Sequence, residues 1–273
     1  MLKKRVIFSL LYDRGMFMLS RNFRLQKVGD LNWLQKNYNF AQIAFSIDEL
    51  VILDVSRGDR NEDSFIDHVR SLATECFVPI AVGGGIRSIE QARRFLHSGA
   101  DKVVVNSLFG IAPEIIAQIA SEFGQQCIIA SVDTKQINDA YTVWTENGTK
   151  LQEQSLSKWL KRITKLPVGE LFLNSIDRDG TGQGYNMELL DFIPENIAVP
   201  VILSGGAGKF QHLAIALENL YVDAAATAHL FNFVGDGLEK ARQGLCEKGL
   251  DLALWNRKTA KALRDVVKIS LTI

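Results

Sequence analysis

Cysteine and histidine are scarce in this chain, and their scarcity excludes several kinds of chemistry. The 273 residues contain three cysteines, Cys76, Cys127 and Cys246, and four histidines. The cysteines are odd in number and far apart, so we expect reduced thiols rather than disulfides or zinc ligands. No metal-binding spacing of His and Cys occurs, and no Ser or Cys lies in a Gly-x-Ser-x-Gly context. We therefore expect no metal, no other cofactor and no covalent hydrolysis.

An excess of charge of either sign is also missing. Lys+Arg and Asp+Glu number 31 each, so the chain has no general attraction to nucleic acid or to an anionic membrane. No apolar run approaches the roughly 20 residues of a transmembrane helix, and charges interrupt the short apolar run of the N-terminal MLKKRVIFSLLYDRG. We therefore expect a cytoplasmic protein without a signal peptide.

What the sequence does contain is an internal repeat. VPIAVGGGIRS recurs as VPVILSGGAGK, each followed by a helical and then a strand-like segment. The matched segments are residues 78–109 with 199–231, 49–54 with 170–175, and 6–11 with 128–133. Apolar strand-like runs that alternate with one-sided helices are typical of a parallel sheet covered on its outside. The repeat therefore predicts an α/β fold, a (βα)8 TIM barrel built as a duplicated half-barrel.

The expected strands and domains follow from the same pattern. Eight strands are expected at residues 5–11, 49–54, 79–82, 102–106, 127–133, 170–176, 201–204 and 224–228. Residues 1–249 are expected to form a single barrel, and residues 250–273 a helical extension packed on it. The connections 12–30 and 134–154 are long, and the second contains an Asn-Gly hairpin signal at Asn147. Long loops at the carboxyl ends of barrel strands usually cover a substrate.

Two glycine clusters at matching repeat positions follow the third and seventh expected strands. They contain Gly84 in one half and Gly205 and Gly206 in the other. Glycines let an anion approach the backbone, and the next helix adds N–H donors; a plain tight turn is the alternative. Asn106 and Ser107 end the neighbouring strand of the first half. Because the clusters occur twice, we expect a phosphorylated small molecule with a phosphate at each end.

Carboxylates end several strands, and one of them has no counterpart in the repeat. Asp133 ends the apolar run IIASVD, whereas the matching first strand ends on Leu11. A carboxylate at this rim can act as a general acid, a general base or a hydrogen-bond anchor. Asp54, Asp177 and Asp179 also follow strands, and we expect Asp177 to cap a loop. If the ancestral reaction used one acid from each half, only the second acid remains.

Four charged residues lie near the starts of four expected strands. They are Arg5, Glu49, Lys102 and Glu170, and Glu49 and Glu170 match in the repeat. Each could be an ordinary solvated strand end. Together, two cations and two anions could form a neutral ring that plugs the barrel or gates a passage.

The ordered motifs resemble the cyclase subunit of imidazole glycerol phosphate synthase. RVIFSLL, ELVILD, VPIAVGGGIRS, GADKVVVNS, IIASVDTK, GELFLNSIDRDGTGQGYN and VILSGGAGK follow one another collinearly over about residues 1–240. The resemblance implies a duplicated barrel that forms a heterodimer with a glutaminase subunit. In that family ammonia passes along the barrel axis and is used at the top to close an imidazole ring on a substrate with two phosphates.

The resemblance also assigns roles to residues. It implies phosphate contacts at Gly84, Asn106, Ser107, Gly205 and Gly206, an ammonia gate at Arg5, Glu49, Lys102 and Glu170, and a contact with the glutaminase at Asp101. Asp133 corresponds to one catalytic aspartate, and Asp179 is a further candidate acid. The second catalytic aspartate is replaced by Leu11, a loop lysine by Leu19, and a phosphate-site serine by His229.

Three hypotheses follow from this combination. The preferred one is an ammonia conduit with weakened cyclase chemistry, which resembles paralogues from surface-polysaccharide gene clusters. In those systems a third enzyme uses the ammonia to convert an acetamido group of a nucleotide sugar to an acetamidino group. The second hypothesis is a working cyclase for histidine biosynthesis, in which Asp133, Asp179 or Asp13 covers for the missing acid. The third is a related phosphoribosyl isomerase, against which the charge ring and SIDRDGT argue.

Overall fold

Eight parallel strands close into a barrel, as the sequence pattern predicts. The structure is a computed structural model that describes residues 3–38, 40–43, 45–229 and 232–254. The barrel strands are β1 (Arg5–Asp13), β4 (Glu49–Asp54), β5 (Ile80–Gly83), β6 (Lys102–Val105), β7 (Ile128–Ile137), β10 (Glu170–Ser175), β11 (Val201–Ser204) and β12 (Ala224–Thr227). They pair in the order β1-β4-β5-β6-β7-β10-β11-β12, and β12 pairs with β1 to close the ring. In this closed order β1 and β7 lie opposite each other.

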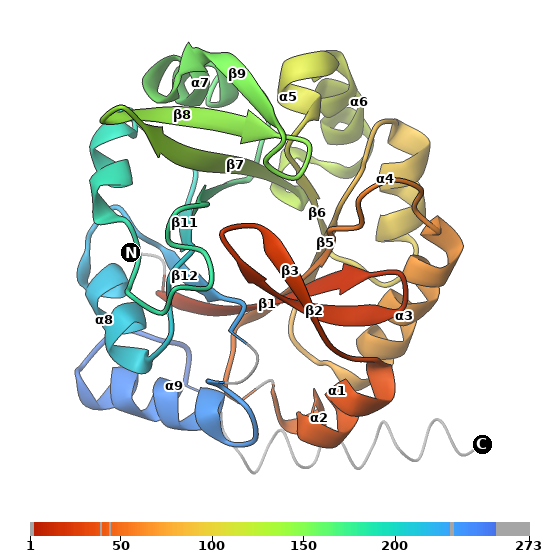
Figure 1. Ribbon diagram of the computed structural model, residues 1–273, viewed down its shortest axis with the longest axis vertical. Helices are drawn as coiled ribbons and strands as arrows, with labels where there is room; N and C mark the ends of the chain where they lie inside the picture. The colour runs from red at the N-terminus through yellow and green to blue at the C-terminus, as the bar shows by residue number, and fades with distance from the viewer. Residues whose placement is uncertain (1–2, 39, 44, 230–231, 255–273) are drawn as a thin grey trace.

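Helices surround the barrel and cover the outer face of the strands (Figure 1). They are α1 (Leu31–Asn37), α2 (Phe40–Ile43), α3 (Glu62–Glu75), α4 (Ile89–Leu96), α5 (Leu108–Ile111), α6 (Pro113–Phe123), α7 (Leu156–Ile163), α8 (Phe210–Glu218) and α9 (Gly237–Glu247), with 3₁₀ turns η1 (Gln125–Cys127) and η2 (Met187–Phe192). In α3 the Asn61 side chain accepts a hydrogen bond from Ser64 N at 3.0 Å and caps the first turn. The helix then buries Phe65, Val69 and Leu72 toward the sheet.

A second, smaller apolar cluster fills the inside of the barrel. Its buried members come from all eight barrel strands: Ile7, Val51, Ala81, Val104, Ile129, Phe172, Ile202, Ala224 and Ala226. Side chains alternate between the two faces of a strand, so residues two positions away on the same strands also point to the axis. This alternation places Arg5 below Ile7, and Ser9 and Leu11 above it.

Both long connections form antiparallel hairpins rather than irregular loops. After β1 the chain forms β2 (Met16–Arg21) and β3 (Arg24–Gly29), and after β7 it forms β8 (Ala140–Thr145) and β9 (Lys150–Ser155). Asn22 (φ 50°) and Phe23 (φ 62°) make the β2–β3 turn, and Asn147 (φ 56°) and Gly148 (φ 73°) lie in the β8–β9 turn. Positive φ at consecutive turn residues matches the right-handed twist of hairpins. The Asn-Gly signal thus marks a real turn.

The start of the expected C-terminal extension lies against the amino-terminal end of β1. Leu252 forms a parallel bridge with Lys4. A buried bidentate ion pair between Arg242 and Asp48, at 2.8 and 2.9 Å, ties α9 to the start of β4. Residues 255–273 lie outside the described residues, so the division into a barrel at 1–249 and a helical extension at 250–273 stays a prediction. No helix in the described part of the chain has the length and apolar content to cross a membrane.

Candidate functional site

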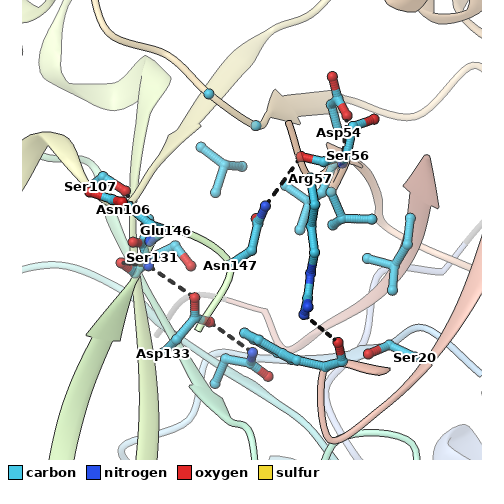
Figure 2. A pocket seen from close by; sticks show the side chains of 18 of the residues that line it. Ser20, Asp54, Ser56, Arg57, Asn106, Ser107, Ser131, Asp133, Glu146 and Asn147 are labelled. Atoms are coloured by element: carbon cyan, nitrogen blue, oxygen red, sulfur yellow. Dashed lines mark hydrogen bonds between the residues drawn. The ribbon is translucent and has the colours of Figure 1, made fainter. Parts of the chain in front are cut away.

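A cavity of about 480 Å³ lies at the carboxyl ends of the barrel strands. Residues of β1, β4, β6, β7, β10 and β11 line it, and both hairpins contribute to the lining, among them Ser20 and Asn147 (Figure 2). Arg57 donates to the Phe23 carbonyl at 2.8 Å, and Asn147 donates to the Ser56 carbonyl at 3.3 Å. Within the described residues, no cluster of three or more His, Cys, Asp or Glu side chains could hold a metal.

Asp133 lies at the base of this cavity, between two amide side chains. Its carboxylate accepts hydrogen bonds from Asn174 at 2.9 Å and from Asn106 at 3.1 Å. Burial raises the pKa of Asp133 to about 6, because desolvation outweighs the stabilising hydrogen bond from Asn174, and the charge of Asp179 adds to the increase. A carboxyl group with a pKa near neutrality can both accept and donate a proton.

Leu11 lines the same cavity from the opposite strand. It is 9% exposed and pairs in register with Leu53 of β4, which also lines the cavity. Asp13 is not among the lining residues, and its carboxylate accepts a hydrogen bond from Arg14 at 2.9 Å. Leu19 packs against the outer core from β2. The first half therefore presents a hydrocarbon side chain where the second half presents Asp133.

Asp179 reaches the cavity, but hydrogen bonds hold it to the first hairpin. Its Oδ2 accepts a hydrogen bond from the Ser20 hydroxyl at 2.5 Å and from Phe23 N at 3.0 Å. Burial raises the pKa of Asp179, although both hydrogen bonds act in the opposite direction. Asp177, in the loop after β10, accepts a hydrogen bond from Gln136 N of β7 at 2.7 Å, and its role as a loop cap stays a prediction.

The first glycine turn borders the cavity together with the side chains expected beside it. Gly84, Asn106 and Ser107 all line it. Gly84 has φ 113°, and a Cβ there would lie 2.2 Å from the Asp54 carbonyl oxygen. Close packing of the backbone therefore requires glycine at this position whether or not an anion binds. The Ser107 hydroxyl accepts a hydrogen bond from Glu146 N at 3.3 Å.

The second glycine turn is packed differently. Gly205 and Gly206 are not among the residues that line the cavity, although Ser204, directly before them, and Ala228, after the next strand β12, are. The Gly206 carbonyl accepts a hydrogen bond from Gly184 N at 2.9 Å, so another loop lies directly against this turn. The matched positions in the two halves thus do not form matched ends of this cavity, and phosphate binding at Gly205 and Gly206 stays a prediction.

The four charges at the strand starts meet in a closed ring. Arg5 contacts Glu49 at 2.9 Å and Glu170 at 2.5 Å, and Lys102 contacts the same two carboxylates at 2.9 and 2.5 Å. Glu49 uses one oxygen for both cations, and its Oε1 has no partner within the described residues, whereas Glu170 uses one oxygen for each.

The two glutamates of the ring therefore differ in their electrostatics. Burial raises the pKa of Glu49 despite the two cations. The pKa of Glu170 is lowered, because its contacts with Arg5 and Lys102 outweigh the desolvation that opposes them. The geometry agrees with these directions, since only Glu170 has both oxygens paired.

Asp101 has a structural partner of its own. Its Oδ2 accepts a hydrogen bond from Ile80 N at 2.8 Å, and Asp48 and Asp223 accept from Val6 N and Val201 N in the same way. An aspartate before one strand thus accepts from an N–H in the first two residues of a neighbouring strand at three places around the barrel. This recurring use accounts for Asp101 without a partner protein, and its contact with a glutaminase stays a prediction.

Comparison with known proteins identifies the family. The family described as "Histidine biosynthesis protein" matches residues 28–235. The chain belongs to this family. One relative is a protein of Parasynechococcus marenigrum (strain WH8102) with the provisional name imidazole glycerol phosphate synthase subunit hisF2. It is 44% identical to this chain over 256 residues, which cover 93% of this chain and 95% of that protein.

Further members of the histidine biosynthesis family carry the subunit name HisF. The imidazole glycerol phosphate synthase subunit HisF of Chlorobaculum tepidum is 37% identical over 256 residues, and that of Chlorobium phaeovibrioides is 37% identical over 255. Each alignment covers 93% of this chain and 100% of the relative. The chain is therefore a HisF-like barrel of the imidazole glycerol phosphate synthase cyclase-subunit family.

Sequence reasoning missed the residues that border the cavity from loops. Arg57 and Arg60, in the loop after β4, and Asn147, in the β8–β9 turn, all line it. Two arginines in the short segment SRGDR directly after a strand were the available signal. Residues that follow barrel strands lie at the functional face, so basic side chains there indicate an anionic ligand.

Proposed function

We propose that this chain takes up ammonia from a separate glutaminase subunit and passes it through the barrel, with cyclase chemistry that is strongly weakened. The observation that carries this proposal is the coexistence of a complete charge ring with Leu11 opposite Asp133. The charge ring, which would admit ammonia, is complete, whereas Leu11 replaces one of the two acids that would use the ammonia.

The loss of the acid bears directly on catalysis. Leucine can neither transfer a proton nor stabilise a developing charge, and loss of an acid or base catalyst typically reduces a rate by roughly 100- to 10,000-fold. Asp13 does not replace it, because it lies outside the cavity lining and bonds to Arg14. Asp133 is thus left without a facing carboxylate on β1.

The interior of the barrel suits neutral ammonia. Above the ring lies the apolar layer that contains Ile7, Val51, Val104 and Phe172. Moving an ion into such a layer is far more costly than moving a small neutral molecule. The ring of paired charges therefore lies where a passage would admit ammonia, and Ser9 and Ser131 lie near the cavity as the first polar side chains above the apolar layer.

Two partners complete this proposal. A glutaminase subunit would bind the face that carries the ring and Asp101, forming a one-to-one heterodimer. Because the cavity has only one of the two acids, we propose that the ammonia serves a third enzyme, an amidotransferase that acts on a nucleotide sugar.

The test measures ammonia use and ammonia supply separately. The purified barrel is given ammonium and the bisphosphorylated ribulosyl substrate of the family, and we expect cyclase turnover at least roughly 100-fold below that of a family member with both acids. With the glutaminase encoded beside its gene, the barrel should raise glutamine hydrolysis, and Lys102→Met should uncouple hydrolysis from delivery. Near-normal cyclase turnover, or no response of the glutaminase, would overturn the proposal.

A second candidate function is a working cyclase that uses Asp179 as its second acid. It is favoured by one observation: Asp179 lines the cavity that holds Asp133, and burial raises its pKa. Asp179→Asn would then abolish turnover as completely as Asp133→Asn. In the conduit proposal, turnover is already low and Asp179→Asn changes it little.

A further inference from the structure

Asp133 and an asparagine on the next strand form an in-register pair inside the barrel. Asp133 of β7 pairs with Asn174 of β10, and Asn174 Nδ2 donates to Asp133 Oδ1 at 2.9 Å. From β6, just beyond Val105, Asn106 donates to Asp133 Oδ2 at 3.1 Å and to the Ser131 carbonyl at 3.2 Å (Figure 2). Both amide groups therefore direct N–H groups at acceptors of the protein.

This arrangement leaves hydrogen-bond acceptors for a ligand. A carboxylate has about four lone-pair sites, and an amide that donates through its nitrogen can still accept through its oxygen. Two buried oxygens of cavity-lining residues, Asn106 Oδ1 and Ser9 Oγ, have no hydrogen-bond partner within the described residues, and Ser9 is 4% exposed. Buried polar atoms without a partner are rare and costly, so these oxygens indicate a ligand that brings hydrogen-bond donors.

The charge of Asp133 also lacks a partner. Among the other carboxylates that line the cavity, Asp54 pairs with Arg60 at 3.5 Å and Glu146 pairs with Lys150 at 3.6 Å. No lysine, arginine or histidine in the described part of the chain forms an ion pair with Asp133. A pKa of about 6 leaves this buried carboxyl mostly ionised at pH 7, and a buried charge without a partner is unfavourable. A cationic ligand would supply the missing charge.

The wall across the cavity is hydrocarbon. Leu11 of β1 and Leu53 of β4 occupy the repeat positions of Asp133 and Asn174, and they pair in the same register. Both leucines line the cavity. Because β1 and β7 lie opposite each other in the closed barrel, a ligand held at Asp133 would extend toward these leucines.

We propose that the cavity binds a small protonated primary amine, whose ammonium group is held by Asp133, Asn174 and Asn106 and whose alkyl part lies against the two leucines. A primary ammonium group has three N–H donors and no acceptor, so it matches a site that offers acceptors. Its charge complements that of Asp133, and its alkyl part leaves water on binding. The site needs neither the charge ring nor a glutaminase, so it stands or falls separately from the proposed conduit.

Calorimetric titration of the full chain with propylammonium chloride, at pH 7 and constant ionic strength, tests the proposal. We expect one molecule per chain, bound at least roughly tenfold more tightly than ammonium, because each buried methylene typically adds about fourfold to an affinity. Tetramethylammonium has the charge but no N–H group, and propanol has no charge, so neither should bind detectably. In protein with ¹³C-labelled aspartate, the carboxyl signal of Asp133 should shift with propylammonium and with neither control compound.

Four variants assign the binding to these residues. Asp133→Asn keeps the size of the side chain but removes its charge, and it should abolish binding. Asn174→Leu gives the second half the residue that the first half has at Leu53, and it should weaken binding by roughly 10- to 100-fold. Leu53→Asn should reduce the preference for propylammonium over ammonium to less than about threefold. Asp177→Asn alters a carboxylate outside the cavity lining and should change the affinity less than about twofold.

Thermal unfolding of each variant without amine shows which variants are folded, and Asp133→Asn decides the question if Asn174→Leu does not fold. The proposal is overturned if propylammonium still binds to Asp133→Asn with the affinity of the wild type, or if Asp177→Asn loses as much affinity as Asn174→Leu. It is also overturned if tetramethylammonium or ammonium binds as tightly as propylammonium.

Discussion

The hairpin of each half of the barrel reaches across the mouth and bonds to the other half. Asn22, in the β2–β3 turn, donates to the carbonyls of Ile176 and Asp177 after β10, and Asn147, in the β8–β9 turn, donates to the carbonyl of Ser56 after β4. Ser56 and Asp177 stand at equivalent positions of the repeat, and both asparagines have positive φ. The duplication therefore preserved the reciprocal exchange of backbone contacts although the hairpin sequences differ.

The halves differ in how firmly each hairpin is held and in what lies below it. The first hairpin has additional bonds to Asp179 from Ser20 and Phe23. In the described part of the chain, the second hairpin is held to the first half by two longer bonds, both of 3.3 Å, from Asn147 to the Ser56 carbonyl and from Glu146 N to the Ser107 hydroxyl. Below the hairpins, the first half has Leu11 where the second half has Asp133. The comparison teaches that the two halves keep matching scaffold contacts although the side chains below them, Leu11 and Asp133, differ in chemistry.

The largest expected effect comes from making the two halves chemically alike. Leu11→Asp places a carboxylate opposite Asp133, and we expect cyclase turnover with ammonium to rise by roughly 100- to 10,000-fold. Leu11→Asn adds a polar group of similar size that cannot transfer a proton, and it should give no such increase. Adding Asp133→Asn to Leu11→Asp should remove the gain. A folded Leu11→Asp variant without a gain would show that Leu19 or His229 has closed the site as well.

The next effect concerns the repeat-matched glutamates of the ring. Glu170→Gln should lower the free energy of unfolding at pH 7 by about 2–4 kcal/mol, because both cations lose charge-assisted bonds in a partly buried site. Glu49→Gln should cost less than about 1 kcal/mol, because burial already disfavours its charge. Urea unfolding of the two variants beside the wild type measures both values.

The pH dependence of the two glutamate variants should also differ. The folded-state pKa of Glu170 is lowered, so the stability that Glu170 contributes is present above its unfolded pKa and is lost as pH falls through the folded pKa. The cost of Glu170→Gln should therefore shrink on acidification. For Glu49 the pKa is raised, so its charge opposes folding increasingly as pH rises. Equal costs for the two variants at every pH would contradict this asymmetry.

A smaller effect is expected from neutralising Asp133. Its folded pKa of about 6 lies above that of an unfolded aspartate, so the folded chain binds the proton more tightly and stability falls as pH rises from about 4 to about 6. Asp133→Asn should abolish this slope and raise the free energy of unfolding at pH 7 by about 1–2 kcal/mol, after allowance for water in the cavity. Thermal unfolding from pH 4 to 8 tests this prediction. If the stability of the wild type rises between pH 4 and 6, and Asp133→Asn shows the same pH profile, the prediction is contradicted.

The smallest effect concerns the two hairpin turns. Asn22→Ala and Asn147→Ala impose similar backbone strain, because the two residues have φ of 50° and 56°. Asn22→Ala also loses two side-chain hydrogen bonds, so it should cost about 1 kcal/mol more than Asn147→Ala. Hydrogen exchange should show faster opening of β2 and β3 in the first variant. If Asn147→Ala costs as much, the second hairpin is held as firmly as the first.

The barrel was predictable because its signal is local and repeated. All eight expected strands begin within one residue of their expected positions, and six of them begin at the expected residue. The pattern missed the continuation of β1 to Asp13 and of β7 to Ile137, where the strands leave the barrel and enter the hairpins. The sequence of β2 and β3 is mixed in polarity and gives no clear strand signal. The contacts of this hairpin with residues 176–179 of the second half show why it forms strands.

The candidate site was predictable only in part. Asp133 and the first glycine turn border the cavity as their positions at strand ends imply. The second turn is not among the lining residues, and Gly184, from the loop after β10, packs against it. The structural role of Asp101 was equally hidden, since its partner Ile80 lies on a neighbouring strand.

Sequence by itself determined the duplicated barrel, the missing acid at Leu11 and the set of charges at the strand starts, because each depends on residue type and on the alternation of side chains along a strand. Only the tertiary structure decided how unequally Glu49 and Glu170 are paired in the ring of these charges. It also decided that the two hairpins exchange contacts across the mouth, and that one glycine turn borders the cavity while its counterpart does not. These features depend on distances between segments far apart in the chain, and such distances are set by how the whole barrel closes and packs.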